Sequence, residues 1–141
     1  MFAMPTELFV KTVASAGVVV CIFILVQLTF EKMFGFYSLI PEQLREERGR
    51  LWVVVLIAVE IMLYAIGPTV FYFWIYTVLP FFSYRAGIGV AIFLYMFGSL
   101  PYALSLALRM KIPGGVLIFT LFFNLLKLTA AWMTITYLMN L

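Results

Sequence analysis

The chain has 141 residues, of which 66% are hydrophobic and 11% charged, and its mean hydropathy is +1.15. Soluble domains carry about 25% charged residues, so this composition excludes an ordinary water-soluble domain and predicts an integral membrane protein. The net charge of +3 comes from nine Lys and Arg against six Glu, with no Asp. We expect that excess to report membrane topology rather than binding of nucleic acid.

Four hydrophobic runs follow one another along the chain. Each exceeds the roughly 20 residues that a helix needs to cross a hydrocarbon core about 30 Å thick. The runs cover approximately residues 8–30, 51–79, 86–108 and 114–139. They predict an all-α membrane protein, a four-transmembrane-helix bundle that forms a single domain over residues 1–141.

Two of the predicted spans contain proline in their interior. In the second span Gly67 precedes Pro68, and in the third span Pro101 follows Leu100. Proline lacks a backbone donor, and its ring clashes with the preceding helical turn. The sequence therefore predicts kinked second and third helices, with the kink of the second near Ile66.

The orientation of the chain follows from the placement of Lys and Arg. The loops after the first and third runs hold six of these residues, whereas the N-terminal segment and the loop after the second run hold two. Basic residues favour the cytoplasmic side of a membrane. We therefore expect both termini on the non-cytoplasmic side and a cytoplasmic loop over residues 32–50. The expected location is a bacterial inner membrane or another energy-transducing membrane, with several passes.

The loop over residues 32–50 is the longest stretch outside the hydrophobic runs. Its segment from Pro41 to Gly49 is typical of a short helix, because proline lies near its start and glycine just past its end. Two interpretations stay open: a solvated or interfacial turn, and a docking surface for a neighbouring subunit. The residues of the possible docking loop are Glu42, Arg45, Glu46 and Arg48.

Two charged residues lie inside the hydrophobic runs, Glu60 in the second and Lys127 in the fourth. A lone ionisable side chain near the bilayer centre costs about 2.5–3.5 kcal/mol on insertion scales, so it usually has a partner. A rise of ~1.5 Å per residue puts Glu60 at a depth of ~14 Å and Lys127 at ~21 Å. The long lysine stem can span that difference. We expect the two side chains to meet if the second and fourth spans are neighbours.

Further polar residues share the faces on which this pair lies. Asn124 is nearly level with Glu60, and Tyr64 follows Glu60 by one turn on the same face. The sequence thus predicts an intramembrane polar seam of Glu60, Tyr64, Asn124 and Lys127, which Tyr95 or Tyr102 could extend. Three uses stay open: a structural pair that orients the second helix against the fourth, a pair that specifies assembly with another polypeptide, and an ionisable centre for transport.

The residue types present restrict the chemistry of the chain. It has no His and no Asp, so a Ser-His-Asp triad or a metal-water site cannot be assembled. We expect no enzyme activity, no catalytic residues, no metal site and no cofactor. Fifteen Phe and eight Tyr are expected mainly as lipid-facing filler and interface anchors, although such surfaces also suit pigments, quinones or acyl chains.

Two functions fit these restrictions. The leading prediction is a non-catalytic integral membrane subunit of a larger membrane complex, or a homo-oligomer, whose partners are membrane lipids and other membrane subunits or itself. The alternative is a small transporter or channel that uses Glu60 and Lys127 as its ionisable centre. The absence of further relay residues weighs against the alternative, because a conducting path needs a continuous polar lining.

Overall fold

The computed structural model describes residues 6–39, 42, 49–76, 84–110 and 112–139, and within that part of the chain all regular structure is helical. Four of its helices are long and apolar enough to cross a membrane, by length and composition. They cover Thr6–Phe34, Arg50–Trp74, Arg85–Arg109 and Gly114–Met139. The predicted all-α class and the four predicted spans are confirmed.

The helical segments differ slightly from the predicted runs. In chain order they are α1 (Thr6–Phe34), α2 (Phe36–Leu39), α3 (Arg50–Ile61), η2 (Met62–Ile66), α4 (Gly67–Tyr76), α5 (Tyr84–Leu94), η3 (Tyr95–Ser99), α6 (Leu100–Arg109) and α7 (Gly114–Met139). Helix α1 continues about one turn past the predicted end at residue 30, whereas α7 has the predicted bounds. The predicted end of the second span, at residue 79, lies outside the described residues.

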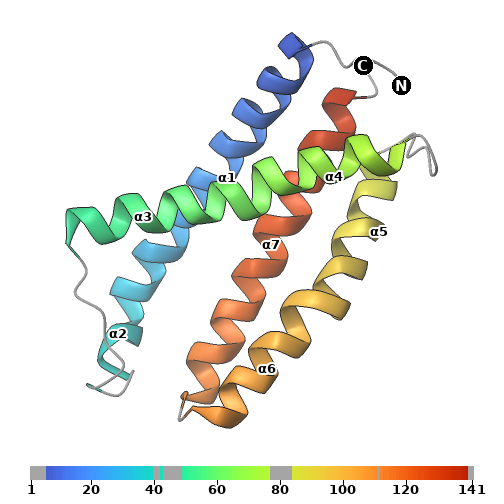
Figure 1. Cartoon of the computed structure of the whole chain (residues 1–141). Coiled ribbons are helices and arrows are strands. Elements are labelled where there is room, and N and C mark those ends of the chain that lie inside the picture. The colour runs from blue at the N-terminus through green and yellow to red at the C-terminus, as the bar shows by residue number, and fades with distance from the viewer. Residues whose placement is uncertain (1–5, 40–41, 43–48, 77–83, 111, 140–141) are drawn as a thin grey trace.

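Helix α7 occupies the centre of the arrangement. Helices α1 and α5 pack along it, and the second span, formed by α3, η2 and α4, lies across α1 and α7 (Figure 1). The start of α1 and the end of α7 lie at the same end of the bundle, since Thr12 Oγ1 lies 3.9 Å from Met139 Sδ. The fourth span therefore positions side chains against each of the other three.

Small side chains allow this close packing. Each span contributes one alanine without exposed surface, namely Ala16, Ala65, Ala91 and Ala131. Helices in lipid approach each other most closely at such residues. Trp132 of α7 fills the space beside them and contacts the rings of Phe71 and Tyr72. The core is thus built of small residues at the crossings and aromatic rings between them.

A π-helical turn precedes each proline of the second and third spans. The Gly67 N–H donates to Met62 O, and the Leu100 N–H donates to Tyr95 O, each five residues back. A wider turn relieves the clash between a proline ring and the carbonyl of the preceding turn. The structure thus shows how both helices continue through proline, while the bending of either span stays a prediction.

The π-helical turn in the second span changes which residues face the core. An additional residue in a turn rotates the following helix by about 100°. A regular α-helix would place Gly67 on the same stripe as Glu60 and Tyr64, but Gly67 is exposed, and Thr69 and Tyr72 are buried. A constant helical repeat from Glu60 therefore does not describe the buried face of α4.

Gly35 folds α2 back against the bundle. Its φ of +64° lies in the left-handed region, and its carbonyl accepts hydrogen bonds from the backbone N–H and the hydroxyl of Ser38, at 3.1 and 2.6 Å. This turn brings the ring of Phe36 to within 4.6 Å of the ring of Phe119, between centroids.

Substitution of Gly35 tests the role of this turn. Gly35→Ala should lower the free energy of unfolding by about 1–2 kcal/mol, the cost of a left-handed conformation for an ordinary L-residue. Gly35→Asn should cost less, because asparagine visits this region more readily. Thermal unfolding in detergent measures both changes. Equal melting temperatures for the wild type and Gly35→Ala would show that the turn does not contribute to stability.

Candidate intramembrane ion-pair site

Lys127 lies on the buried face of α7. The buried residues of this helix follow a helical repeat that includes Phe123, Lys127, Ala131 and Ile135. The Lys127 side chain has an exposed fraction of 0%, so its ammonium group does not extend to an interface. A charged group in that position needs partners within the protein.

Two other spans supply these partners. Lys127 Nζ donates to Glu60 Oε2 at 2.5 Å and to Gln27 Oε1 at 2.8 Å. The centroid of the Tyr64 ring lies 5.2 Å from the same nitrogen, close enough for a cation–π attraction. The ammonium group thereby connects α1, α3 and α7 at one point, and we call this group of Gln27, Glu60, Tyr64 and Lys127 the lysine clasp.

Gln27 extends the lysine clasp toward the end of α1. Its carbonyl oxygen is used by Lys127, and its Nε2 donates to Glu31 Oε1 at 3.4 Å, one turn further along the helix. Gln27 is buried and Glu31 is half-buried. The Gln27 amide therefore accepts one hydrogen bond through its oxygen and donates another through its nitrogen, and these two bonds fix the orientation of the side chain.

Phenylalanine rings lie next to the lysine clasp on the side of α2. Five aromatic rings form a circle in which each contacts the next and the last contacts the first. In order they are Phe30, Phe34, Phe36, Phe119 and Phe123, with centroids of neighbouring rings 4.6–6.2 Å apart. Phe123 precedes Lys127 by one helical turn, and Phe30 follows Gln27 by nearly one turn. These rings separate the polar groups from the α2 end of the bundle.

The other neighbours of the lysine clasp are apolar as well. Ala131 and Trp132, about one turn beyond Lys127, are fully buried. Ala131 forms a hydrophobic cluster with Val20 and Ile24 of α1. Within the described residues, a continuous polar lining from one end of the bundle to the other is absent. The arrangement can hold three helices together through one buried ammonium group.

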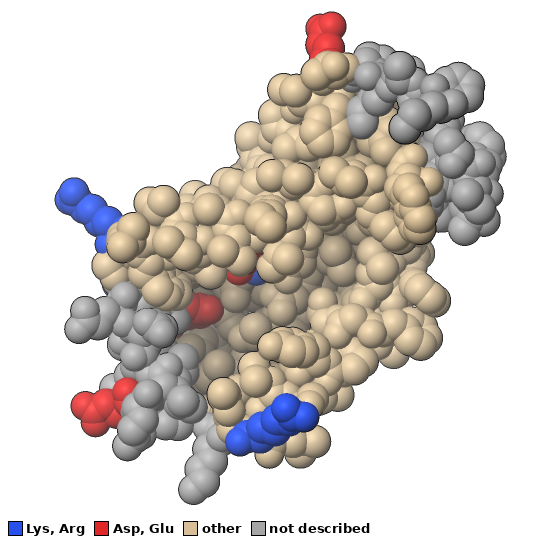
Figure 2. Space-filling view, in the orientation of Figure 1, with Lys and Arg blue, Asp and Glu red and all other residues tan. Residues whose placement is uncertain are grey.

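The carboxylate of the lysine clasp is only partly enclosed. The Glu60 side chain keeps an exposed fraction of 16%, in contrast to the full burial of Lys127. The face shown in Figure 2 is hollowed beneath α3, and acidic and basic atoms are visible inside the hollow. The carboxylate therefore has access to the surroundings that the ammonium group lacks.

The structure brings together three of the four residues of the predicted seam. Glu60, Tyr64 and Lys127 meet, whereas Asn124 is half-buried and, within the described part of the chain, makes no hydrogen bond. Of the two possible extensions, the Tyr95 hydroxyl donates to Leu121 O at 3.1 Å, and Tyr102 is exposed.

The possible docking loop is described only in part. Glu42 is exposed, and Arg45, Glu46 and Arg48 lie outside the described residues. The use of the seam and of the loop stays a prediction.

Sequence reasoning did not include Gln27 among the expected partners of Lys127. A signal for it exists in the sequence. Gln27 continues the stripe of Ala16, Val20 and Ile24, which is the buried face of α1. An amide on such a face needs a partner from another helix, since hydrocarbon offers none.

These features define the class of the protein. Four helices that are long and apolar enough to cross a membrane, with an ion pair between two of them, define a multi-pass integral membrane protein. Among the described residues, no three potential metal ligands lie together. Comparison of the chain with protein-family models, with curated proteins and with solved structures gave no match.

Proposed function

We propose that this chain is a non-catalytic integral membrane subunit of a larger membrane complex, or of a homo-oligomer, in which the Glu60–Lys127 pair fixes the packing of the helices. The observation that supports this function is the complete burial of Lys127 between Glu60 and Gln27. An ammonium group with acceptors from two other spans serves as a connection between helices, and its full enclosure separates it from any solute.

The third span supports an assembly role. In its most apolar stretch 6% of the residues are buried, against 28% in the first and in the fourth spans. Its exposed side chains include Phe93, Phe97 and Tyr102. A span that the chain itself hardly covers offers a surface to a neighbouring subunit, and aromatic side chains are favoured in such contacts.

The proposal includes the topology expected from the sequence. Both termini would lie on the non-cytoplasmic side, the loop over residues 32–50 would face the cytoplasm, and the second and third helices would be kinked. The membrane would be a bacterial inner membrane or another energy-transducing membrane. The excess of Lys and Arg in the loops after the first and third spans supports this orientation.

Native mass spectrometry tests the assembly role. The full chain is extracted from its native membrane with a gentle detergent before the measurement. We expect a stoichiometric complex with other membrane subunits or with further copies of the chain. Phe97→Gln, at a side chain that is 74% exposed in the third span, should reduce the fraction of complex. A monomer as the sole species would contradict the proposal.

The matched control for that variant is Val18→Gln. Val18 lies in the middle of the first span and is 60% exposed, so both substitutions place an amide in a similar lipid-facing position. We expect the complex to persist in Val18→Gln. Equal loss in both variants would assign the effect to membrane insertion rather than to a contact of the third span.

The second candidate function is a small transporter or channel centred on Glu60 and Lys127. The partial exposure of Glu60 favours it, because an accessible carboxylate could receive a proton or a cation. Proton flux into proteoliposomes loaded with a pH-sensitive dye separates the two functions. If the chain is a transporter, Glu60→Gln/Lys127→Met should assemble normally and lose flux; if it is a subunit without transport, flux should be absent in the wild type as well.

A further inference from the structure

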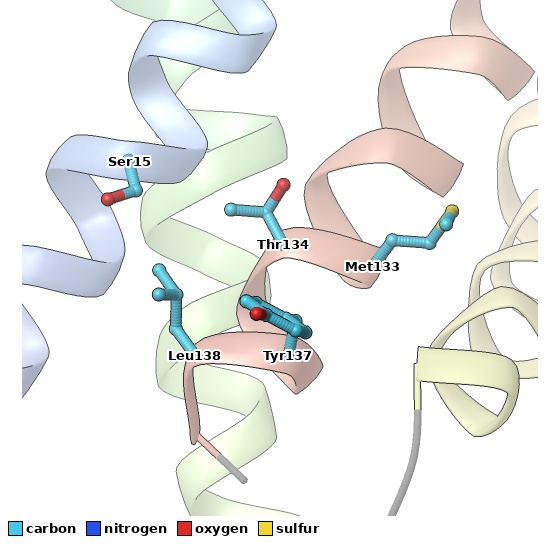
Figure 3. A pocket seen from close by; sticks show the side chains of 5 residues that line it. All are labelled: Ser15, Met133, Thr134, Tyr137 and Leu138. Atoms are coloured by element: carbon cyan, nitrogen blue, oxygen red, sulfur yellow. The ribbon is translucent and has the colours of Figure 1, made fainter. Parts of the chain in front are cut away.

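A groove lies between α1 and α7 near the end of the bundle where these helices start and finish. It has a volume of about 470 Å³ and is lined by Ser15, Met133, Thr134, Tyr137 and Leu138 (Figure 3). The lining combines apolar side chains with three hydroxyl groups and carries no charge. Such a groove accepts a hydrocarbon chain along its length and offers hydrogen bonds to an ester.

The hydroxyl groups of this groove differ in their partners. The Thr134 hydroxyl donates to Ala130 O at 2.9 Å, so its hydrogen is already in use. Ser15 and Tyr137 have no hydrogen-bond partner within the described residues. Since a free hydroxyl is unfavourable in hydrocarbon, these two groups need an acceptor from outside the described chain.

Two exposed charges continue the face of α1 that carries Ser15. Lys11 precedes Ser15 by one turn, and Glu7 precedes Lys11 by another turn, so the three side chains share one face. Neither Glu7 nor Lys11 forms an ion pair within the described part of the chain. Ser15 lines the groove and Lys11 lies one turn nearer the start of α1, so the two charges continue along α1 from Ser15 toward the chain termini; they line an adjacent pocket with Thr6, Val10 and Ala14.

We infer that this groove binds one phospholipid with a phosphoethanolamine head group, in the leaflet on the side of the chain termini. Lys11 meets the phosphate and Glu7 accepts a hydrogen bond from the amine, which a short ethylene link separates from the phosphate. The hydroxyls of Ser15 and Tyr137 donate to the ester carbonyls. One acyl chain lies against Met133 and Leu138.

Titration of the delipidated full chain with dioleoylphosphatidylethanolamine, followed by native mass spectrometry, tests this site. We expect one bound lipid per chain. Ser15→Leu fills the groove and should weaken binding about tenfold or more. Lys11→Gln should weaken binding about two- to fivefold, as for loss of an exposed charge contact. Lys32→Gln, at the opposite end of α1, is the matched control and should bind like the wild type.

Dioleoylglycerol, which has the same chains without the head group, separates the two parts of the site. We expect it to bind more weakly than the phospholipid and to be insensitive to Lys11→Gln. Equal binding of both lipids, or equal effects of Lys11→Gln and Lys32→Gln, would overturn the inference. The inference would also be overturned if the groove of the wild type bound a second copy of the chain instead of lipid, and if that dimer were lost in Ser15→Leu. Because Lys11 is exposed, its variant stays informative even if Ser15→Leu fails to fold.

Discussion

Glu60→Gln should destabilise the folded chain by about 3–5 kcal/mol, the cost of removing one partner from a buried ion pair. The substitution keeps the size of the side chain and an acceptor oxygen, so it removes mainly the charge. Lys127 would then be a fully buried ammonium group without a counter-charge. Reversible unfolding in mixed micelles with an increasing fraction of a denaturing detergent measures the change.

The other variants of the lysine clasp should follow a defined order. Lys127→Met should cost less than Glu60→Gln, because the remaining carboxylate is 16% exposed and can be solvated. Glu60→Gln/Lys127→Met should cost the least of the three, since no charge stays buried. Lys32→Met, at an exposed position, is the matched control and should change stability little. Additive losses in the double variant would contradict the clasp.

Gly87→Ala should strongly disrupt the packing of α5 against α7. An added Cβ would lie 2.5 Å from Thr136 Oγ1 and 2.8 Å from Trp132 O, both closer than real Cβ contacts allow. Neither neighbour can give way easily, because Trp132 O belongs to the backbone and the Thr136 hydroxyl donates to it at 2.8 Å. Overpacking of this kind costs about 1–3 kcal/mol or more. A lower melting temperature in detergent measures it.

Gly89, two residues further along the same helix, provides the control. An added Cβ there meets nothing within 4 Å, and the residue is exposed. Gly89→Ala should be neutral or slightly stabilising, since alanine favours the helix by about 1 kcal/mol over glycine. A similar loss in both variants would show that the contact of Gly87 with α7 does not determine stability.

Much of the fold could be predicted from local properties of the sequence. Run length and hydropathy located the spans, because a membrane helix must satisfy its own backbone and cover a fixed thickness. The meeting of Glu60 and Lys127 could also be anticipated. Two opposite charges at similar depth, each costly when alone in lipid, have few other stable arrangements.

Other parts of the site could not be derived in this way. The π-helical turn over Met62–Ile66 shifts the buried face of the second span, and a stripe drawn with a constant helical repeat cannot include that shift. Asn124 shares its stripe with Lys127 but is only half-buried, and within the described residues it makes no hydrogen bond to α3. The contact between Phe36 and Phe119 depends on the turn at Gly35.

The sequence by itself determined that this is a four-span membrane protein with an acidic residue deep in the second span and a basic residue deep in the fourth. Those properties follow from the free energy of transferring each residue from water into lipid, which depends on the residue type. The tertiary structure decided that Lys127 is fully enclosed, that Gln27 is its second acceptor, and that Glu60 keeps some exposure. These depend on which helix faces meet around α7, and helix association in lipid is set by close packing that hydropathy does not record.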